Sequence, residues 1–246
     1  MFDELWPGGP KFHQAEYGFK LGTDSVLLAH FTNPTRAKKI LDLGCGAGVL
    51  TVLTAYKAPK ARVLGIEIQP ESAAVCRENM AANGFPPENI LEGDLREHRK
   101  LFEAGSFDLV ISNPPYFPVK GGFNAPDDKR ATARDERSCT MDDLCKAAGY
   151  LVKWGGAFTV VHRPERLSEL LCALTKYGLE PKRLRMVQHK ASSAPNLILV
   201  EARRGGKAGL TIEPPLILAN DDGSDTEEIQ KIYHRGTTGT ALCLTT

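Results

Sequence analysis

Three features are scarce in this 246-residue sequence: long apolar runs, paired cysteines and net charge. No uncharged apolar run approaches the ~20 residues of a membrane-spanning helix, so we expect no membrane association. The six cysteines lie apart without a Cys-x-x-Cys pair, and no Cys/His group has the spacing of zinc ligands. We therefore expect no metal ion, reduced thiols and a cytoplasmic location. The net charge of +1 does not by itself indicate a nucleic-acid partner.

The positive charge is nevertheless concentrated in one stretch. Residues 181–207 carry seven Lys or Arg residues, Arg183 and Arg185 among them, and only one acidic residue, Glu201. A cluster of this kind can face the phosphates of a nucleic acid. It can equally be a solvated strand edge, where basic side chains oppose aggregation. We predict that Arg183 and Arg185 contact RNA, with the strand edge as the alternative.

Most of the chain alternates between short apolar runs and amphipathic segments. This order predicts a doubly wound, mostly parallel sheet with helices on both faces, as in Rossmann-like folds. Asp24 is placed to cap the first helix. The predicted strands are residues 40–43, 62–68, 89–92, 107–112 and 156–161, and the predicted helices are residues 25–31, 49–56, 71–83, 95–102, 142–152 and 165–177.

The last third of the chain changes character. Residues 182–190 and 196–203 both have the composition of strands, with only a turn between them, and they predict an antiparallel hairpin that completes a seven-stranded sheet. Residues 210–218 are a further candidate strand, and residues 225–234 a final short helix. We expect one domain over residues 1–246. It divides into an N-terminal cap (1–38), a catalytic core (39–205) and a C-terminal extension (206–246).

A glycine loop follows the first predicted strand of the core. In Asp42-Leu43-Gly44-Cys45-Gly46-Ala47-Gly48, the glycines allow a tight turn and let a ligand touch the main chain. A dinucleotide loop has the spacing GxGxxG, whereas this loop has GxGxG. A carboxylate at Asp42 would repel phosphates and attract an ammonium group. The loop therefore favours S-adenosylmethionine over NAD as the cofactor, bound by Asp42, Gly44, Cys45, Gly46 and Gly48.

Two further acidic residues follow the next two predicted strands. Glu67, beside Ile68, lies at the end of the second strand, where a carboxylate can accept both ribose hydroxyls. Asp94, beside Leu95, follows the third strand and is placed to accept from the adenine amino group. Each residue alone is a weak indication. The glycine loop, Glu67 and Asp94 follow one another at the ends of three consecutive strands, and together they predict a complete cofactor site.

The fourth predicted strand runs into Asn113-Pro114-Pro115-Tyr116. An amine on a heteroaromatic ring is a poor nucleophile because its lone pair is delocalised. The Asn113 side-chain oxygen and the Pro114 carbonyl can accept hydrogen bonds from its two N–H groups and free that lone pair. Pro114 and Pro115 stiffen the loop, and Tyr116 offers a ring for base stacking. We predict a catalytic loop, with a simple strand-ending turn as the alternative.

These residues together resemble the class I methyltransferases that act on amino nitrogens. Within that group the sequence is most similar to the bacterial tRNA (adenine-N6)-methyltransferases that modify the adenine next to the anticodon of a valine tRNA. The likeness covers roughly residues 15–205. It rests on the glycine loop, the Asn-Pro-Pro-Tyr motif, residues 19–24 (Phe-Lys-Leu-Gly-Thr-Asp), residues 65–67 (Gly-Ile-Glu) and residues 130–136 (Arg-Ala-Thr-Ala-Arg-Asp-Glu).

The resemblance implies further roles. The N-terminal segment would pack over the cofactor, with Thr23 or Asp24 near its amino-acid end. Arg130 and Arg134, in the loop 117–137, would grip an RNA phosphate, although pairing with acidic residues of the same loop is the alternative. The expected partner is tRNA, with no obligate protein partner.

Other functions remain open at this level. The Asn-Pro-Pro-Tyr motif also suits glutamine-N5 methylation of a protein, but only 39 residues precede the first core strand, which leaves little room for an N-terminal helical domain. A methyltransferase of DNA or ribosomal RNA bases and a non-catalytic RNA-binding module are further alternatives.

Overall fold

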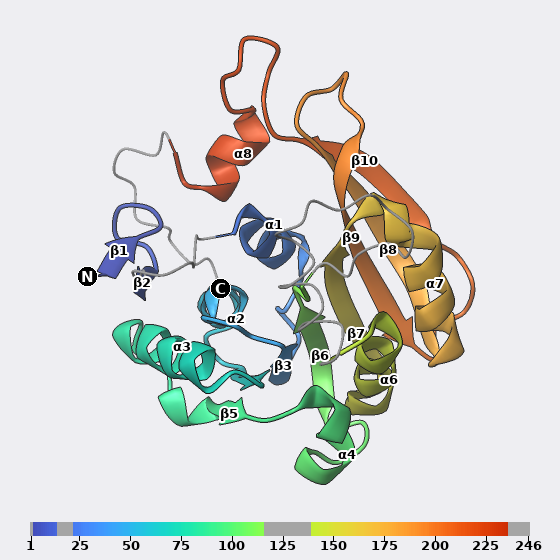
Figure 1. Ribbon diagram of the computed structural model, residues 1–246. Helices are drawn as coiled ribbons and strands as arrows, with labels where there is room; N and C mark the ends of the chain where they lie inside the picture. The colour runs from blue at the N-terminus through green and yellow to red at the C-terminus, as the bar shows by residue number, and fades with distance from the viewer. Residues whose placement is uncertain (1, 14–21, 116–138, 236–246) are drawn as a thin grey trace, which may run out of the picture.

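The computed structural model describes residues 2–13, 22–115 and 139–235 (Figure 1). Over these residues the large sheet has eight strands in the order β10-β8-β9-β7-β6-β3-β4-β5. All neighbouring strands are parallel except β9, which runs antiparallel to both β7 and β8. The strands are β3 (Lys39–Leu43), β4 (Arg62–Glu67), β5 (Ile90–Glu92), β6 (Phe107–Ser112), β7 (Val152–His162), β8 (Leu179–Gln188), β9 (Pro195–Arg204) and β10 (Thr211–Ile217).

The predicted doubly wound, mostly parallel sheet with an antiparallel hairpin is confirmed, and the count of seven strands is corrected to eight. The eighth strand is β10, which the sequence offered only as a further candidate. It pairs in parallel with the outer edge of β8, with Thr211 opposite Arg183. A strand edge exposes unpaired backbone groups, and β10 satisfies those of β8.

Helices cover both faces of the sheet (Figure 1). The two faces form separate apolar clusters because neighbouring residues of a strand point in opposite directions: Ile40 packs in the first cluster and Leu41 in the second. The first cluster contains residues of α1 (Thr23–Phe31), α2 (Val49–Lys57), α3 (Pro70–Ala82) and α8 (Glu227–Ile232), and the second contains residues of α6 (Met141–Leu151) and α7 (Leu167–Lys176).

The shorter elements complete the described residues. Two N-terminal strands pair with each other, and the second also contacts α3. Short helices lie in the connections between the longer elements. The shorter elements are β1 (Phe2–Glu4), β2 (Lys11–His13), α4 (His98–Leu101) and the 3-10 helices η1 (Pro87–Asn89), η2 (Leu95–Glu97) and η3 (Pro164–Arg166). Within this part of the chain, no helix is long and apolar enough to cross a membrane.

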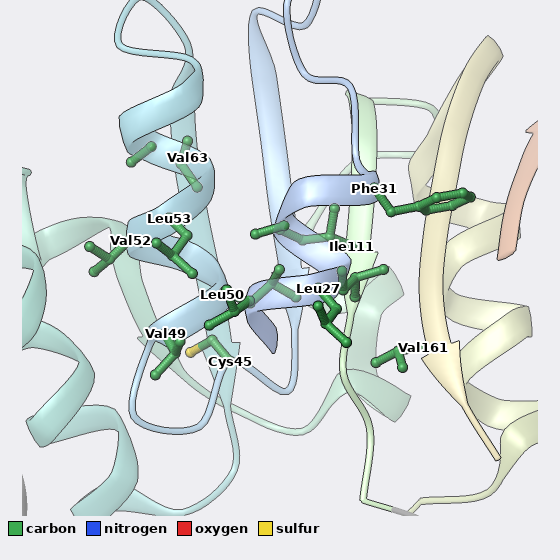
Figure 2. Packing of buried hydrophobic residues seen from close by; sticks show 14 of the residues in the cluster. Leu27, Phe31, Cys45, Val49, Leu50, Val52, Leu53, Val63, Ile111 and Val161 are labelled. Atoms are coloured by element: carbon green, nitrogen blue, oxygen red, sulfur yellow. The ribbon is translucent and has the colours of Figure 1, made fainter. Parts of the chain in front are cut away.

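Helix α1 is the element that brings the N-terminal region to the site. Figure 2 shows Leu27 and Phe31 of this helix packed beside Ile111 of β6 and Val161 of β7. At its C-terminal end, the Lys57 ammonium donates to the carbonyls of Ala29, His30 and Thr32 at 2.6, 3.1 and 2.7 Å. These contacts neutralise helix carbonyls that would otherwise lack partners.

The prediction that Asp24 caps α1 is wrong. The N-cap residue is Gly22, and no side chain caps the helix there. Because the helix begins at Thr23, Asp24 lies inside its first turn. A carboxylate in the first turn still interacts favourably with the helix dipole.

Candidate active site

The carboxyl ends of β3, β4, β5 and β6 enclose a cavity of about 250 Å³. This is the position where open α/β sheets bind ligands, at the edge where the strand order reverses. The cavity is lined by a majority of the residues that the sequence assigned to the cofactor and to catalysis. They are Gly44, Gly46, Glu67, Ile68, Asp94, Leu95, Asn113, Pro114 and Pro115.

Four predicted cofactor residues do not line this cavity: Thr23, Asp42, Cys45 and Gly48. Thr23 is exposed at the start of α1, and the other three are buried. The predicted residues Tyr116, Arg130 and Arg134 lie outside the described residues.

The glycine loop presents its main chain to the cavity. Gly44 and Gly46 have φ angles of 73° and 52°, a left-handed backbone that residues with a Cβ rarely adopt. A Cβ added at either position would meet no atom within 4 Å, so open space lies in front of both. The loop is fixed to β4 because the amides of Gly44 and Cys45 donate to the Ile66 carbonyl at 2.9 and 3.0 Å. A rigid, uncovered backbone of this kind fits a ligand that contacts the main chain.

The residues behind the loop hold it against α3. A Cβ at Gly48, whose φ is 88°, would lie 2.5 Å from the Cys76 sulfur, so no other residue fits there without displacing Cys76 of α3. The Asn79 side-chain amide donates to the Ala47 carbonyl at 2.8 Å. Gly48 therefore acts through packing, and Asn79 is a contributor that the sequence patterns did not identify.

Glu67 is positioned by the backbone on both sides of the cavity mouth. Its two carboxylate oxygens accept from the amides of Gly46 and Gln69, each at 2.9 Å. The residue is only 7% exposed, yet it lines the cavity. Each carboxylate oxygen can accept more than one hydrogen bond. Glu67 is thus oriented and keeps acceptor capacity for two hydroxyl groups.

Asp94 has an additional role that the sequence did not indicate. Its carboxylate accepts from the Arg96 amide at 2.8 Å and pairs with the Arg96 guanidinium, so it caps η2. Burial raises the pKa of Asp94, but its hydrogen bonds to Arg96 outweigh this, and the net effect is a lowered pKa. The carboxylate is therefore held in its charged, accepting form at the wall of the cavity.

Asp42 is a buried carboxylate with an incomplete set of partners. One of its oxygens accepts from the Thr51 hydroxyl at 2.6 Å, and among the described residues the other has none. Burial raises the pKa of Asp42 to about 7, against the opposing effect of the Thr51 hydrogen bond. The residue lies one position before the cavity wall at Leu43. An unpaired buried acceptor there fits a cationic group bound in front of the loop.

Asn113 lies at the carboxyl end of β6 and forms part of the cavity wall. Its side-chain Nδ2 donates to the Ser25 hydroxyl of α1 at 2.9 Å. The preceding Ser112 donates its hydroxyl to the Leu43 carbonyl at 2.7 Å, which joins the end of β6 to the end of β3. Pro114 is buried and Pro115 is exposed. No pattern in the sequence pointed to Ser25 or Ser112.

Arg183 and Arg185 do not line this cavity, and both have partners within the protein. Arg183 pairs with Glu201 at 2.8 Å and with Glu213 at 2.6 Å. Arg185 binds Glu228 through two hydrogen bonds of 2.7 and 2.8 Å. Within the protein these guanidinium groups fasten β10 and α8 to β8, and the predicted RNA contact stays a prediction. The charge count missed this because Glu213 and Glu228 lie outside residues 181–207.

Within residues 2–13, 22–115 and 139–235, no group of three or more His, Cys, Asp or Glu residues is arranged to hold a metal ion.

Comparisons with known proteins agree with this geometry. A tRNA1(Val) (adenine(37)-N6)-methyltransferase of Porphyromonas gingivalis is 34% identical over 197 residues, which cover 77% of this chain and 76% of the relative. A protein of the same name from Tolumonas auensis is 31% identical and covers 89% and 90%. Among solved structures, a predicted O-methyltransferase from Agrobacterium tumefaciens has a TM-score of 0.70 at 24% identity, covering 87% of this chain and 96% of that one. That likeness shows the fold alone.

A doubly wound sheet with this loop and this cavity defines a Rossmann-like methyltransferase. The model of the methyltransferase small domain family matches residues 18–176. The chain belongs to that family, and it is an enzyme that transfers methyl groups.

The raised pKa of Asp42 predicts how stability depends on pH. Between pH 3.8 and about 7 the folded protein holds a proton on Asp42 that the unfolded chain has lost. The free energy of unfolding should therefore fall as the pH rises through this range. Asp42→Asn should flatten that part of the curve, measured by urea unfolding of the ligand-free protein.

Thr51→Val provides the matched comparison for this prediction. It removes the hydrogen bond that lowers the pKa of Asp42, so the decline should extend to higher pH. Identical curves for wild type and Asp42→Asn would show that Asp42 does not titrate in this range.

Proposed function

We propose that the protein transfers a methyl group from S-adenosylmethionine to the exocyclic N6 amine of an adenine in tRNA, the adenine next to the anticodon of a valine tRNA. The names of the relatives from Porphyromonas gingivalis and Tolumonas auensis support this substrate. The similarity to the second relative extends over nine-tenths of both chains.

One observation carries the proposal. Asn113 and Pro114 line the same cavity as Gly44, Gly46 and Glu67. Hydrogen-bond acceptors suited to an amine thus lie in the same cavity as the glycine backbone and the carboxylate suited to the methyl donor. A fold that bound the cofactor without using it would have no need for this juxtaposition.

The residues of the cofactor site have distinct tasks in this proposal. Gly44 and Gly46 would offer their backbone, Glu67 would accept the ribose hydroxyls, and Asp94 would accept from the adenine amino group. An ammonium of the amino-acid part, bound in front of the loop, would favour the charged form of Asp42 behind it. When bound, S-adenosylmethionine supplies a methyl group that its sulfonium already activates for transfer.

The acceptors act on the other reactant. The Asn113 Oδ1 and the Pro114 carbonyl would accept hydrogen bonds from the two N–H groups of the target amine. These hydrogen bonds would draw the nitrogen towards a tetrahedral geometry and free its lone pair. Among the described residues, neither oxygen receives another hydrogen bond. Because the proline ring fixes φ, these acceptors need little reorganisation when the substrate arrives. We propose that Tyr116 stacks on the base.

The first test removes one acceptor. Asn113→Ala should lower methyl transfer by about 10²-fold or more, the usual effect of deleting one preorganised group that acts in the transition state. The dissociation constant for S-adenosylmethionine, measured by calorimetry, should change little because the cofactor groups remain. Parallel losses of both quantities would contradict the role assigned to Asn113.

The second test identifies the substrate. Total tRNA from a strain that lacks the enzyme should accept labelled methyl groups from the purified protein and S-adenosylmethionine. Nucleoside analysis should find N6-methyladenosine, confined to a valine tRNA. Label in protein alone would favour glutamine methylation, and label in ribosomal RNA alone would move the substrate to another RNA.

The third test concerns the RNA contacts. We propose that Arg130 and Arg134 contact RNA phosphates, whereas Arg185 does not because Glu228 already binds it. Arg130→Gln and Arg134→Gln should each weaken tRNA binding and reduce the slope of log K against log salt by about 0.7–0.9. Arg185→Gln is the matched control and should leave the slope unchanged. A reduced slope in Arg185→Gln, with unchanged slopes in Arg130→Gln and Arg134→Gln, would place the RNA contact on β8 instead.

A further inference from the structure

We propose that Ser25 is a positioning residue that holds the Asn113 amide in the orientation seen in the structure. The two side chains come from distant parts of the chain and meet at 2.9 Å, Nδ2 to Oγ. Ser25 is 8% exposed, so water competes little for this contact. Nδ2 faces α1, which leaves Oδ1 as the polar atom of the amide available to the cavity.

Orientation matters because the two ends of an amide have opposite hydrogen-bonding character. Oδ1 accepts, whereas Nδ2 carries two N–H donors. If the Asn113 amide turned by 180°, its donors would face the donors of the target amine, and one of the two acceptors for catalysis would be lost. In the structure the Ser25 hydroxyl accepts from Nδ2, and this hydrogen bond must break before the amide can turn.

Helix α1 makes Ser25 a rigid support. The residues that follow it, Val26, Leu27 and Leu28, are at most 4% exposed in the apolar cluster. The other end of the helix is held by Lys57. The Ser25 amide also donates to the Gly22 carbonyl at 3.2 Å, within the first turn. A hydroxyl fixed on a buried helix can hold Asn113 more firmly than one on a loop.

The inference rests on the proposed function only in assigning Oδ1 to the target amine. Ser25→Ala should lower kcat roughly 2- to 10-fold, which corresponds to the loss of one neutral hydrogen bond. The KM for S-adenosylmethionine should not change, since Ser25 is not part of the cavity lining. Ser25→Thr retains an Oγ and should recover most of the lost kcat.

Thr32→Ala is the matched control for general loosening of α1. Thr32 is also buried, and its hydroxyl bonds the Leu28 carbonyl at 2.7 Å, at the end of the helix opposite to Ser25. This variant should lower the melting temperature and leave kcat unchanged. Equal losses of kcat in Ser25→Ala and Thr32→Ala would reduce Ser25 to a structural residue and overturn the proposal.

A spectroscopic measurement tests the contact without any substrate. The side-chain amide signals of Asn113 in a ¹⁵N–¹H NMR spectrum are assigned by their absence in Asn113→Ala. In Ser25→Ala they should shift and exchange faster with water, while in Thr32→Ala they should stay in place. Unmoved signals in Ser25→Ala would overturn the proposal even if tRNA methylation were established. Shifted signals would support it even if another amine proved to be the substrate.

Discussion

The strand order of the sheet reverses between β3 and β6, and the whole candidate site depends on that reversal. From β3 the chain proceeds to β4 and β5 on one side, and it then returns to β6 on the other. The segments that leave β3 and β6 therefore diverge and open a cavity between them. Asp42 pairs with Ile111 across these two strands, so the glycine loop and Asn113 emerge side by side. The order of the strands alone therefore places the cofactor-binding and acceptor groups side by side, whatever contacts their side chains make.

Polar contacts between distant segments then hold this opening in shape. Ser112 joins β6 to Leu43, Asn79 joins α3 to the glycine loop, and Ser25 joins α1 to Asn113. Asp42 departs from this pattern of satisfied groups, because one buried oxygen has no partner among the described residues. A carboxylate in such a position opposes folding when charged. Costs of this kind are expected at functional sites, where a ligand supplies the missing interaction.

The sequence predicted those parts of the site that depend on local pattern. Gly44, Gly46, Asp94 and Asn113 follow strands and Glu67 ends one, and the parallel topology alone brings such positions to one edge. Ser25 could not be predicted in this way, because its partner is 88 residues away and a serine in an apolar helix has many possible roles. The same limit applies to the fold: strands β3 to β9 had clear apolar patterns, but the place of β10 depended on which edge remained free.

Arg183 and Arg185 have partners that a local charge count does not include. The stretch 181–207 is strongly basic, yet Glu213 and Glu228 fold back from later segments and pair with its central arginines. Arg183 also lines a hollow with Asp108, which lies at the start of β6, whereas Asn113 follows the end of that strand. At ~3.3 Å per residue, the six residues of β6 separate those positions by roughly 17–20 Å. A phosphate bound at Arg183 would therefore contribute little to placing a base beside Asn113. We therefore expect the contacts that orient a target base at the carboxyl edge of the sheet, where the cavity opens.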